Sequence, residues 1–274
     1  MTSEPVRAGA GWLALREPAD AAARSTALVE ELCPYLADDR VTRVHDLGCG
    51  TGSMARWLAP RLSGPQHWVL HDRDAELLPL AEADPPRGSS DGAPVSVETR
   101  HDDITRLDPS ELADASLVTA SALLDMLTAD ELDRLVHHCA STGSPLLLAL
   151  SVTGRVDLAP ADPSDEPFTA AFNEHQRRAS AIGLRLGPDA LEAAVERFTG
   201  LGREVEVRAS PWRLGPDSTQ LTREWLAGWV GAACDQRPEL DRLRPSYVER
   251  RLAELDQGRL TVTVHHQDLL VRPA

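Results

Sequence analysis

The chain has 274 residues, and its composition excludes several classes of protein. Its formal net charge is −15, from 28 lysines and arginines against 43 aspartates and glutamates, so it should repel nucleic acid and anionic membranes. It lacks both an apolar run long enough to span a bilayer and the layout of a secretory signal. Its four cysteines lie far apart, without metal-ligand spacing. We therefore expect a soluble cytoplasmic protein with reduced thiols and no metal site.

The length suits one elaborated α/β domain, 1–274, which begins with a helical cover at 1–40. Apolar residues recur at helical spacing from about Pro18 to Leu36, and Pro34 lies near the end of that stretch. The preceding apolar patch, 12–16, could fold over a ligand or cover a face of the sheet. The spacing thus predicts one leading helix ahead of the core.

A glycine-rich turn with the sequence Asp-Leu-Gly-Cys-Gly-Thr-Gly occupies residues 46–52. Apolar residues at 41–47 indicate a buried strand before it, and the spacing at 53–58 indicates a helix after it. Alternate glycines let the main chain turn sharply and approach a ligand closely. A plain tight turn is the alternative. A dinucleotide fingerprint would need its third glycine one residue later, where the chain has Ser53.

This turn matches the first motif, acid-x-Gly-x-Gly-x-Gly, of the class I (Rossmann-like) S-adenosylmethionine-dependent methyltransferases, and the chain resembles that family. The resemblance implies a doubly wound α/β fold with a mostly parallel seven-stranded sheet and helical insertions over the pocket. It also implies S-adenosylmethionine as cofactor, bound at this turn by Asp46, Gly48, Cys49, Gly50 and Gly52.

A second strand at 66–71 ends in the acid Asp72, about twenty residues after the glycines. A carboxylate has two adjacent acceptor oxygens, so Asp72 can accept both hydroxyls of a ribose. A surface acid or helix cap is the alternative for this residue. Arg73 follows it and is included in the cofactor site, and Asp74 is placed to cap the next helix.

A turn-rich loop, 84–94, leads to a third strand at 95–100. In the resembled family, an aspartate and an aliphatic residue after this strand contact the adenine, which implies that role for Asp103 and Ile104. Asp102 is the alternative for the same contact, because sequence alone does not exclude a slip of one residue.

The fourth strand, 115–120, is followed by the loop 121–126 and a capping-box helix that starts near Thr128. Loops at the carboxyl ends of strands line the crevice of an open α/β sheet, so Ser121 should contact the cofactor. Asp125 is the first acidic side chain of this loop. Asp125 could contact the substrate, or its carboxylate could simply accept hydrogen bonds from backbone amides, and the sequence favours neither interpretation.

A uniformly apolar fifth strand, 145–152, completes the cofactor-binding core, 41–152. Helical insertions at 153–200 and 215–257 should cover the pocket, the first having its irregular part at about 157–182. In that part, His175 is the candidate base, although a lone histidine is more often structural. Asn173 and Gln176 could orient the substrate.

Trp212 follows a predicted strand at 203–208 and is a further candidate for substrate contact. In the second insertion, Trp225 and Trp229 share a helix face, which more often indicates core packing than a ligand site. This helical region could also form a lid or the surface of a homodimer. The last strand, within 258–274, should be the antiparallel edge of the sheet.

The resemblance spans about 41–152 and implies a transferase that methylates a small molecule. His175 and Asp125 are the candidate catalytic residues. A base is needed only for some acceptors. A non-catalytic protein that binds the same cofactor, and an enzyme that uses it for another reaction, are the alternatives. The expected setting is bacterial secondary or specialised metabolism.

Overall fold

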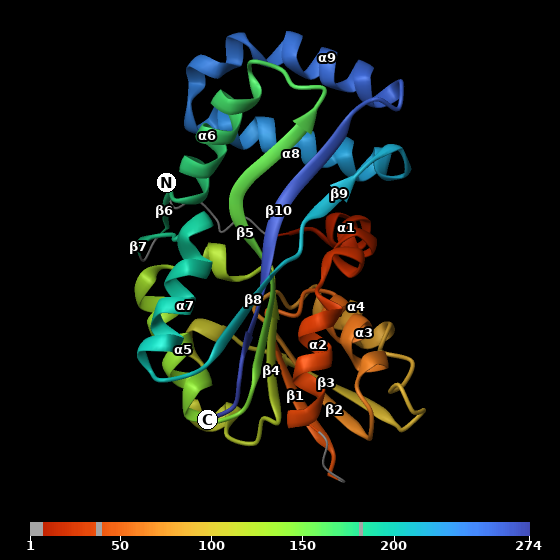
Figure 1. Cartoon of the computed structure of the whole chain (residues 1–274), viewed down its shortest axis with the longest axis vertical. Helices are drawn as coiled ribbons and strands as arrows, with labels where there is room; N and C mark the ends of the chain where they lie inside the picture. Colours follow the sequence, from red (N-terminus) through yellow and green to blue (C-terminus); the bar gives the residue numbers. More distant parts are fainter. Residues whose placement is uncertain (1–7, 37–39, 181–182) are drawn as a thin grey trace.

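A mixed β-sheet runs along the length of the molecule (Figure 1). The computed structural model describes residues 8–36, 40–180 and 183–274. The strand order is β3-β2-β1-β4-β5-β10-β8, and the short β9 pairs with β10 beside this path. The strands of the sheet are β1 (Thr42–Leu47), β2 (Gln66–Asp72), β3 (Val95–His101), β4 (Leu117–Ser121), β5 (Leu146–Ala159), β8 (Val205–Ala209), β9 (Trp212–Leu214) and β10 (Thr261–Val271).

The first five strands pair in parallel, and β10 is antiparallel to both β5 and β8. The predicted doubly wound, mostly parallel sheet of seven strands is therefore confirmed, with β9 as a short addition. The expectation that the last strand forms the edge is wrong. Its alternating pattern has an apolar continuation, Leu269 to Val271, that is buried between β5 and β8.

Helices cover both faces of the sheet (Figure 1). One face carries α2 (Thr26–Leu32), α3 (Ser53–Leu58) and α4 (Leu78–Ala83), and its core includes Trp57 and Trp68. The other carries α5 (Ala129–Ser141) and α7 (Ala190–Gly200), and its core includes Leu132 and Phe198. The predicted capping box at the start of α5 is present, with the Thr128 side chain bonded to the amide of Glu131. No helix within the described ranges is long and apolar enough to cross a membrane.

A third core lies beyond the carboxyl end of the parallel strands, where β5 and β10 continue between α6 (Asp165–Gln176), α8 (Thr219–Gln236) and α9 (Arg244–Asp256) (Figure 1). Trp225 and Trp229 stack here, with ring centroids 5.2 Å apart, and both are buried. The two tryptophans pack in the core, which the sequence analysis favoured over a ligand site. The first insertion begins later than predicted, because 153–159 continues β5 and pairs with β10.

Leu150, within the long strand β5, has a positive φ of 56°. The buried carboxylate of Asp268 on β10 accepts hydrogen bonds from the amides of Leu150 at 2.8 Å and of Ser25 at 2.7 Å. The hydroxyl of Ser210 donates to the same carboxylate. One side chain thus joins β5, β10, the start of α2 and the loop after β8.

The single leading helix expected at about 18–36 is two helices, α1 (Ala10–Ala23) and α2. The break occurs because Arg24 leaves helical geometry and the side chain of Ser25 caps α2 at the amide of Leu28. Pro18 lies inside α1, and the apolar patch around Trp12 belongs to the same helix. The described residues exclude 1–7 and 37–39 of the predicted cover, and 181–182 at the end of the irregular part of the first predicted insertion.

Candidate functional site

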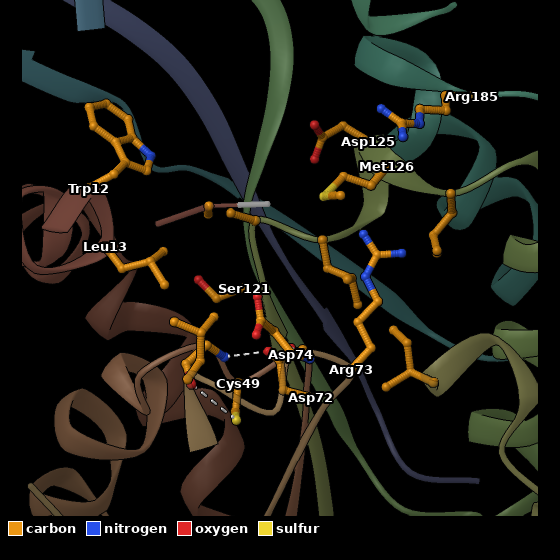
Figure 2. Close-up of a pocket in the computed structure, with 18 of the residues that line it drawn as sticks. Trp12, Leu13, Cys49, Asp72, Arg73, Asp74, Ser121, Asp125, Met126 and Arg185 are labelled. Atoms are coloured by element: carbon orange, nitrogen blue, oxygen red, sulfur yellow. Dashed lines mark hydrogen bonds between the residues drawn. The ribbon is translucent and has the colours of Figure 1, made fainter. Parts of the chain in front are cut away.

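A cavity of about 810 Å³ opens at the carboxyl ends of β1, β2, β3 and β4 (Figure 2). Its volume lies within the range of about 300–1,000 Å³ typical of small-molecule sites. The residues after the four strands form its floor, while Trp12 and Leu13 of α1 and the end of α6 border its other side. The position agrees with the crevice of an open α/β sheet, where ligands bind.

The glycine turn adopts the predicted geometry. Gly48, Gly50 and Gly52 have φ values of +70°, +56° and +83°, a region that residues with a Cβ rarely adopt. The amides of Gly48 and Cys49 both donate to the carbonyl of His71, which ties the turn to β2. Gly48, Cys49 and Gly50 line the cavity, whereas Gly52 is not among its lining residues and serves as the N-cap of α3.

Asp46, at the end of β1, brings a buried carboxylate to the cavity. Its Oδ1 accepts a hydrogen bond of 2.7 Å from the hydroxyl of Thr119, but Oδ2 has no partner among the described residues. Burial raises the pKa of this carboxyl to about 6. A buried oxygen without a partner is costly, so the site favours a ligand with a cationic donor group here.

Asp72 links the second strand to the glycine turn. Its Oδ2 accepts from the amide of Gly50 at 2.7 Å and its Oδ1 from the amide of Asp74 at 2.8 Å (Figure 2). Each carboxylate oxygen retains further acceptor capacity, and the residue lines the cavity. The geometry is thus compatible with the predicted acceptance of two ribose hydroxyls.

Asp74 does not cap α4 as predicted. Its carboxylate accepts from the amide of Glu76 at 3.0 Å in the preceding turn, and α4 starts later, with Leu77 at its N-cap. The helix starts later than predicted because residues 75–77 form a separate turn before it.

Asp102, Asp103 and Ile104 all line the cavity after β3, so the structure brings both alternatives for the adenine contact to the site. The carboxylate of Asp102 lies 3.1 Å from Nδ1 of the buried His71. That of Asp103 accepts from the amide and the hydroxyl of Thr105. Both carboxylates are anchored by a neighbour, and both lie at the cavity.

The loop after β4 supplies Ser121 and Asp125 to the cavity, as predicted. Arg24 donates to the hydroxyl of Ser121 over 3.1 Å, and the same guanidinium reaches Ser53 at the start of α3. Asp125 lies in a short 3-10 helix, Leu124–Met126, and is half-buried. Removal from solvent raises the pKa of its carboxyl to about 6.

Two of the three residues that the sequence placed near the acceptor on α6 line the cavity, namely His175 and Gln176. Burial and the adjacent Arg178 lower the pKa of His175, and the Arg178 guanidinium donates to its ring. Asn173 is directed elsewhere, because its Nδ2 donates to the carbonyl of Gly154 at 2.8 Å. It is not among the lining residues of this cavity.

Trp212 is also outside the cavity lining, with only 3% of its surface exposed. Its indole N–H donates to Asp20 at 2.9 Å, and the Arg16 guanidinium lies over its ring. The predictions of substrate contact by Trp212 and Asn173 are therefore not supported. Trp212 instead holds α1 against β9 and β10.

Sequence reasoning missed two arginines, Arg178 and Arg185, that border the cavity together with the predicted Arg73. Arginine is frequent along this chain, so neither position stands out in the sequence. Residues 8–36, 40–180 and 183–274 contain no group of three histidine, cysteine or acidic side chains arranged for a metal ion. At the strand ends the lining is mainly acidic but includes Arg73, and Arg178 and Arg185 line the cavity beside β6 (Ala179–Ser180) and β7 (Gly183–Leu184).

Residues 44–145 match the sequence profile of a family described as a methyltransferase domain. No curated protein shows significant sequence similarity to the chain. Among solved structures, a cyclopropane-fatty-acyl-phospholipid synthase-like protein from Lactobacillus casei is 12% identical, with a TM-score of 0.53 over 97% of this chain and 94% of that one. This likeness shows a shared fold.

A methyltransferase from Geobacter sulfurreducens, solved with S-adenosylhomocysteine, is 14% identical, with a TM-score of 0.44 and full coverage of both chains. A mycolic acid cyclopropane synthase, also solved with S-adenosylhomocysteine, is 13% identical, with a TM-score of 0.49 over 90% of this chain and 83% of that one.

Proposed function

We propose that the chain is a class I, Rossmann-like S-adenosylmethionine-dependent methyltransferase that transfers a methyl group to a small-molecule acceptor, because residues 44–145 match the profile of a methyltransferase domain. The observation that carries the proposal is the cavity at the strand ends, which is lined by the glycine turn, by Asp46, whose Oδ2 has no partner among the described residues, and by Asp72. A bacterial specialised pathway is the setting we propose for it.

The residues around the glycine turn suit the cofactor chemically. The cofactor has an ammonium group, a ribose and an adenine, and it supplies a methyl group bonded to a cationic sulfonium. Asp46 would hold the ammonium group through its free oxygen, and Asp72 would accept the ribose hydroxyls. Asp103 or Asp102 would accept from the adenine amine, with Ile104 beside the ring. Ser121 borders the same space.

The other half of the cavity would hold the acceptor. Asp125 is ionised at neutral pH, but its raised pKa makes it a stronger base than an exposed carboxylate. We assign it the role of accepting a proton from the acceptor, and His175, whose pKa is lowered, is the second candidate. Trp12, Leu13 and Met126 border the space with apolar surface and would exclude water.

Calorimetry with S-adenosylhomocysteine tests cofactor binding directly. We expect saturable binding of one molecule per chain, and its absence for a folded protein would overturn the proposal. Turnover with any acceptor then eliminates the alternative of a non-catalytic binder, and the mass of the product distinguishes methylation from another reaction of the same cofactor.

We further propose a cytoplasmic location, since all four cysteines are free thiols and three of them are buried. The acidic net charge of −15 supports a small molecule rather than nucleic acid as the acceptor. A homodimer is testable by measuring the mass of the protein in solution. The tryptophans of α8 would not form its surface, because they are buried within one chain.

A further inference from the structure

Two arginines, Arg178 and Arg185, lie opposite each other at the base of a short hairpin beside the cavity. β6 and β7 pair in antiparallel fashion, with Ala179 opposite Leu184. Directly before and after this pair, the amide of Arg185 donates to the carbonyl of Arg178 over 3.3 Å. The two arginines are therefore cross-strand neighbours, and both line the cavity. Like charges placed opposite each other destabilise a hairpin, so this arrangement needs a compensating interaction.

Backbone hydrogen bonds attach the hairpin to the rest of the site. Arg185 forms an isolated β-bridge with Thr128, and the amide of Leu186 donates to the carbonyl of Leu127 at 2.8 Å. These contacts attach the hairpin to the segment between Asp125 and α5. Figure 2 shows Arg185 on the same side of the cavity as Asp125 and Met126. The backbone thus holds the base candidate and the basic pair in one place.

Among the described residues, no carboxylate forms a close ion pair with either arginine, although the charges of Asp125 and Glu131 act on Arg185 from a distance. Within the described residues, the guanidinium of Arg178 bonds to His175, while the Nε atom of Arg185 is buried without a hydrogen-bond partner. Burial lowers the pKa of Arg185, and repulsion from Arg178 and Arg73 lowers it further. Glu131, a nearby acid, already accepts hydrogen bonds from the amide and hydroxyl of Thr128.

Charged side chains of both signs line the cavity: Arg73 lies among the acids at the strand ends, and Asp125 and Glu131 lie near the arginine pair. Asp46, Asp72 and Asp103 lie at the strand ends, where the cationic cofactor is proposed to bind. Arg178 and Arg185 lie in the half left for the acceptor, in a chain whose net charge is −15. An anionic acceptor would be attracted both by this pair and by the sulfonium of the cofactor.

We propose that Arg178 and Arg185 bind an anionic group, a carboxylate or a phosphate, on the methyl acceptor. Guanidinium groups present paired N–H donors that match the oxygens of both anions. His175 would act here as a positioning residue that orients Arg178, which accounts for its contact with that guanidinium. The inference rests on the proposed methyltransferase function and identifies the chemical class of its substrate.

The test uses the full chain saturated with S-adenosylhomocysteine, titrated in a calorimeter with benzoate, inorganic phosphate and the neutral analogue benzamide. We expect at least one of the two anions to bind measurably and benzamide not to bind. Arg178→Gln and Arg185→Gln should each weaken anion binding at least about tenfold. Arg185→Lys, which keeps the charge but loses the paired donors, should bind with intermediate affinity.

The matched control is Arg223→Gln, which removes the same charge from the exposed surface of α8. It should leave anion affinity unchanged, and all four variants should bind S-adenosylhomocysteine as the natural chain does. Preference for benzoate or for phosphate identifies a carboxylate or a phosphate acceptor. If neither anion binds, or if the arginine variants bind them equally well, the inference is wrong. Failure of S-adenosylhomocysteine to bind the natural chain would instead overturn the proposed function.

Discussion

The amide of Gly50 donates a hydrogen bond to Oδ2 of Asp72 over 2.7 Å, which joins the glycine turn after β1 to the acid after β2. The other oxygen of Asp72 accepts from the amide of Asp74. Two amides thus orient one carboxylate, and its remaining acceptor capacity faces the cavity. This link makes the shape of the turn and the ribose site depend on each other.

Asp72→Asn should therefore weaken binding of S-adenosylhomocysteine. The amide group of asparagine can offer an acceptor to only one of the two backbone amides, and its NH2 group would face the other. Loss of charged hydrogen bonds of this kind costs about 1.5–3 kcal/mol, or roughly 10- to 150-fold in affinity. Calorimetry measures the change. Asp130→Asn, in the exposed first turn of α5, is the control, and an equal loss in both variants would contradict the ribose assignment.

Cofactor affinity should fall as the pH falls below about 6. Burial raises the pKa of Asp46 to about 6, so the free protein takes up a proton there below that pH. The ammonium group of the cofactor stays protonated in this range and needs the ionised carboxylate. Binding must then displace the proton, which weakens affinity toward a limit of about tenfold per pH unit.

Titrations of S-adenosylhomocysteine between pH 5 and pH 8 measure this dependence. Asp46→Asn should weaken binding at pH 8 and remove most of the pH dependence, because no proton is exchanged at that position. Asp125→Asn is the matched control, since its carboxyl also has a pKa raised to about 6 but lies in the acceptor half. If Asp125→Asn flattens the profile and Asp46→Asn does not, the ammonium site has been misplaced.

The cofactor half of the site could be predicted from sequence because each residue follows the end of a strand. Glycine turns, strand-end acids and apolar runs are local signals, so Asp46, Gly50 and Asp72 were found within single short segments. The parallel pairing of the first five strands follows from the same alternation of strands and helices. These features needed no knowledge of distant contacts.

The acceptor half of the site could not be predicted in the same way, because it is formed by contacts between segments that are distant in the sequence. Arg178 and Arg185 flank a hairpin whose strands have two residues each. Backbone contacts with Leu127 and Thr128 hold this hairpin at the cavity. Asn173 was a plausible ligand on the same helix as His175, but it turns to the carbonyl of Gly154, which lies in the unpredicted extension of β5. A helix pattern indicates which residues share a face and does not indicate what the face contacts.

Asp268→Ala should strongly destabilise the fold. The buried carboxylate accepts hydrogen bonds from the amides of Leu150 and Ser25, and its loss would leave both amides without this acceptor. At about 1–3 kcal/mol for each of the two unsatisfied amides, we expect the free energy of unfolding to fall by roughly 2–6 kcal/mol. Urea denaturation measures it. Asp157→Ala on β5 removes an exposed carboxylate paired with Arg155 and should cost under about 1 kcal/mol. Equal losses would contradict the role of Asp268.

A buried pair of histidines should make the fold sensitive to mild acid. Nδ1 of His45 lies 3.0 Å from Nε2 of His71, and neither ring is exposed to solvent. Asp114 and Asp102 contact the outer nitrogens of the two rings. Burial, and then the neighbouring His71, lower the pKa of His45 to about 4. Burial also lowers the pKa of His71.

The sign of the effect follows from these pKa values. An unfolded histidine titrates near 6.5, so between about pH 6.5 and pH 4 the unfolded chain binds more protons at His45 than the folded one does. Stability is thus fully present above pH 6.5 and is lost as the pH falls, by on the order of 3 kcal/mol for His45.

Urea denaturation at pH 7.5 and pH 5 should show a smaller difference in the free energy of unfolding for His45→Asn than for the natural chain. His137→Asn, on the exposed side of α5, controls for an ordinary histidine and should keep the full difference. If His45→Asn loses as much stability on acidification as the natural chain, protonation of the buried pair does not drive the acid sensitivity.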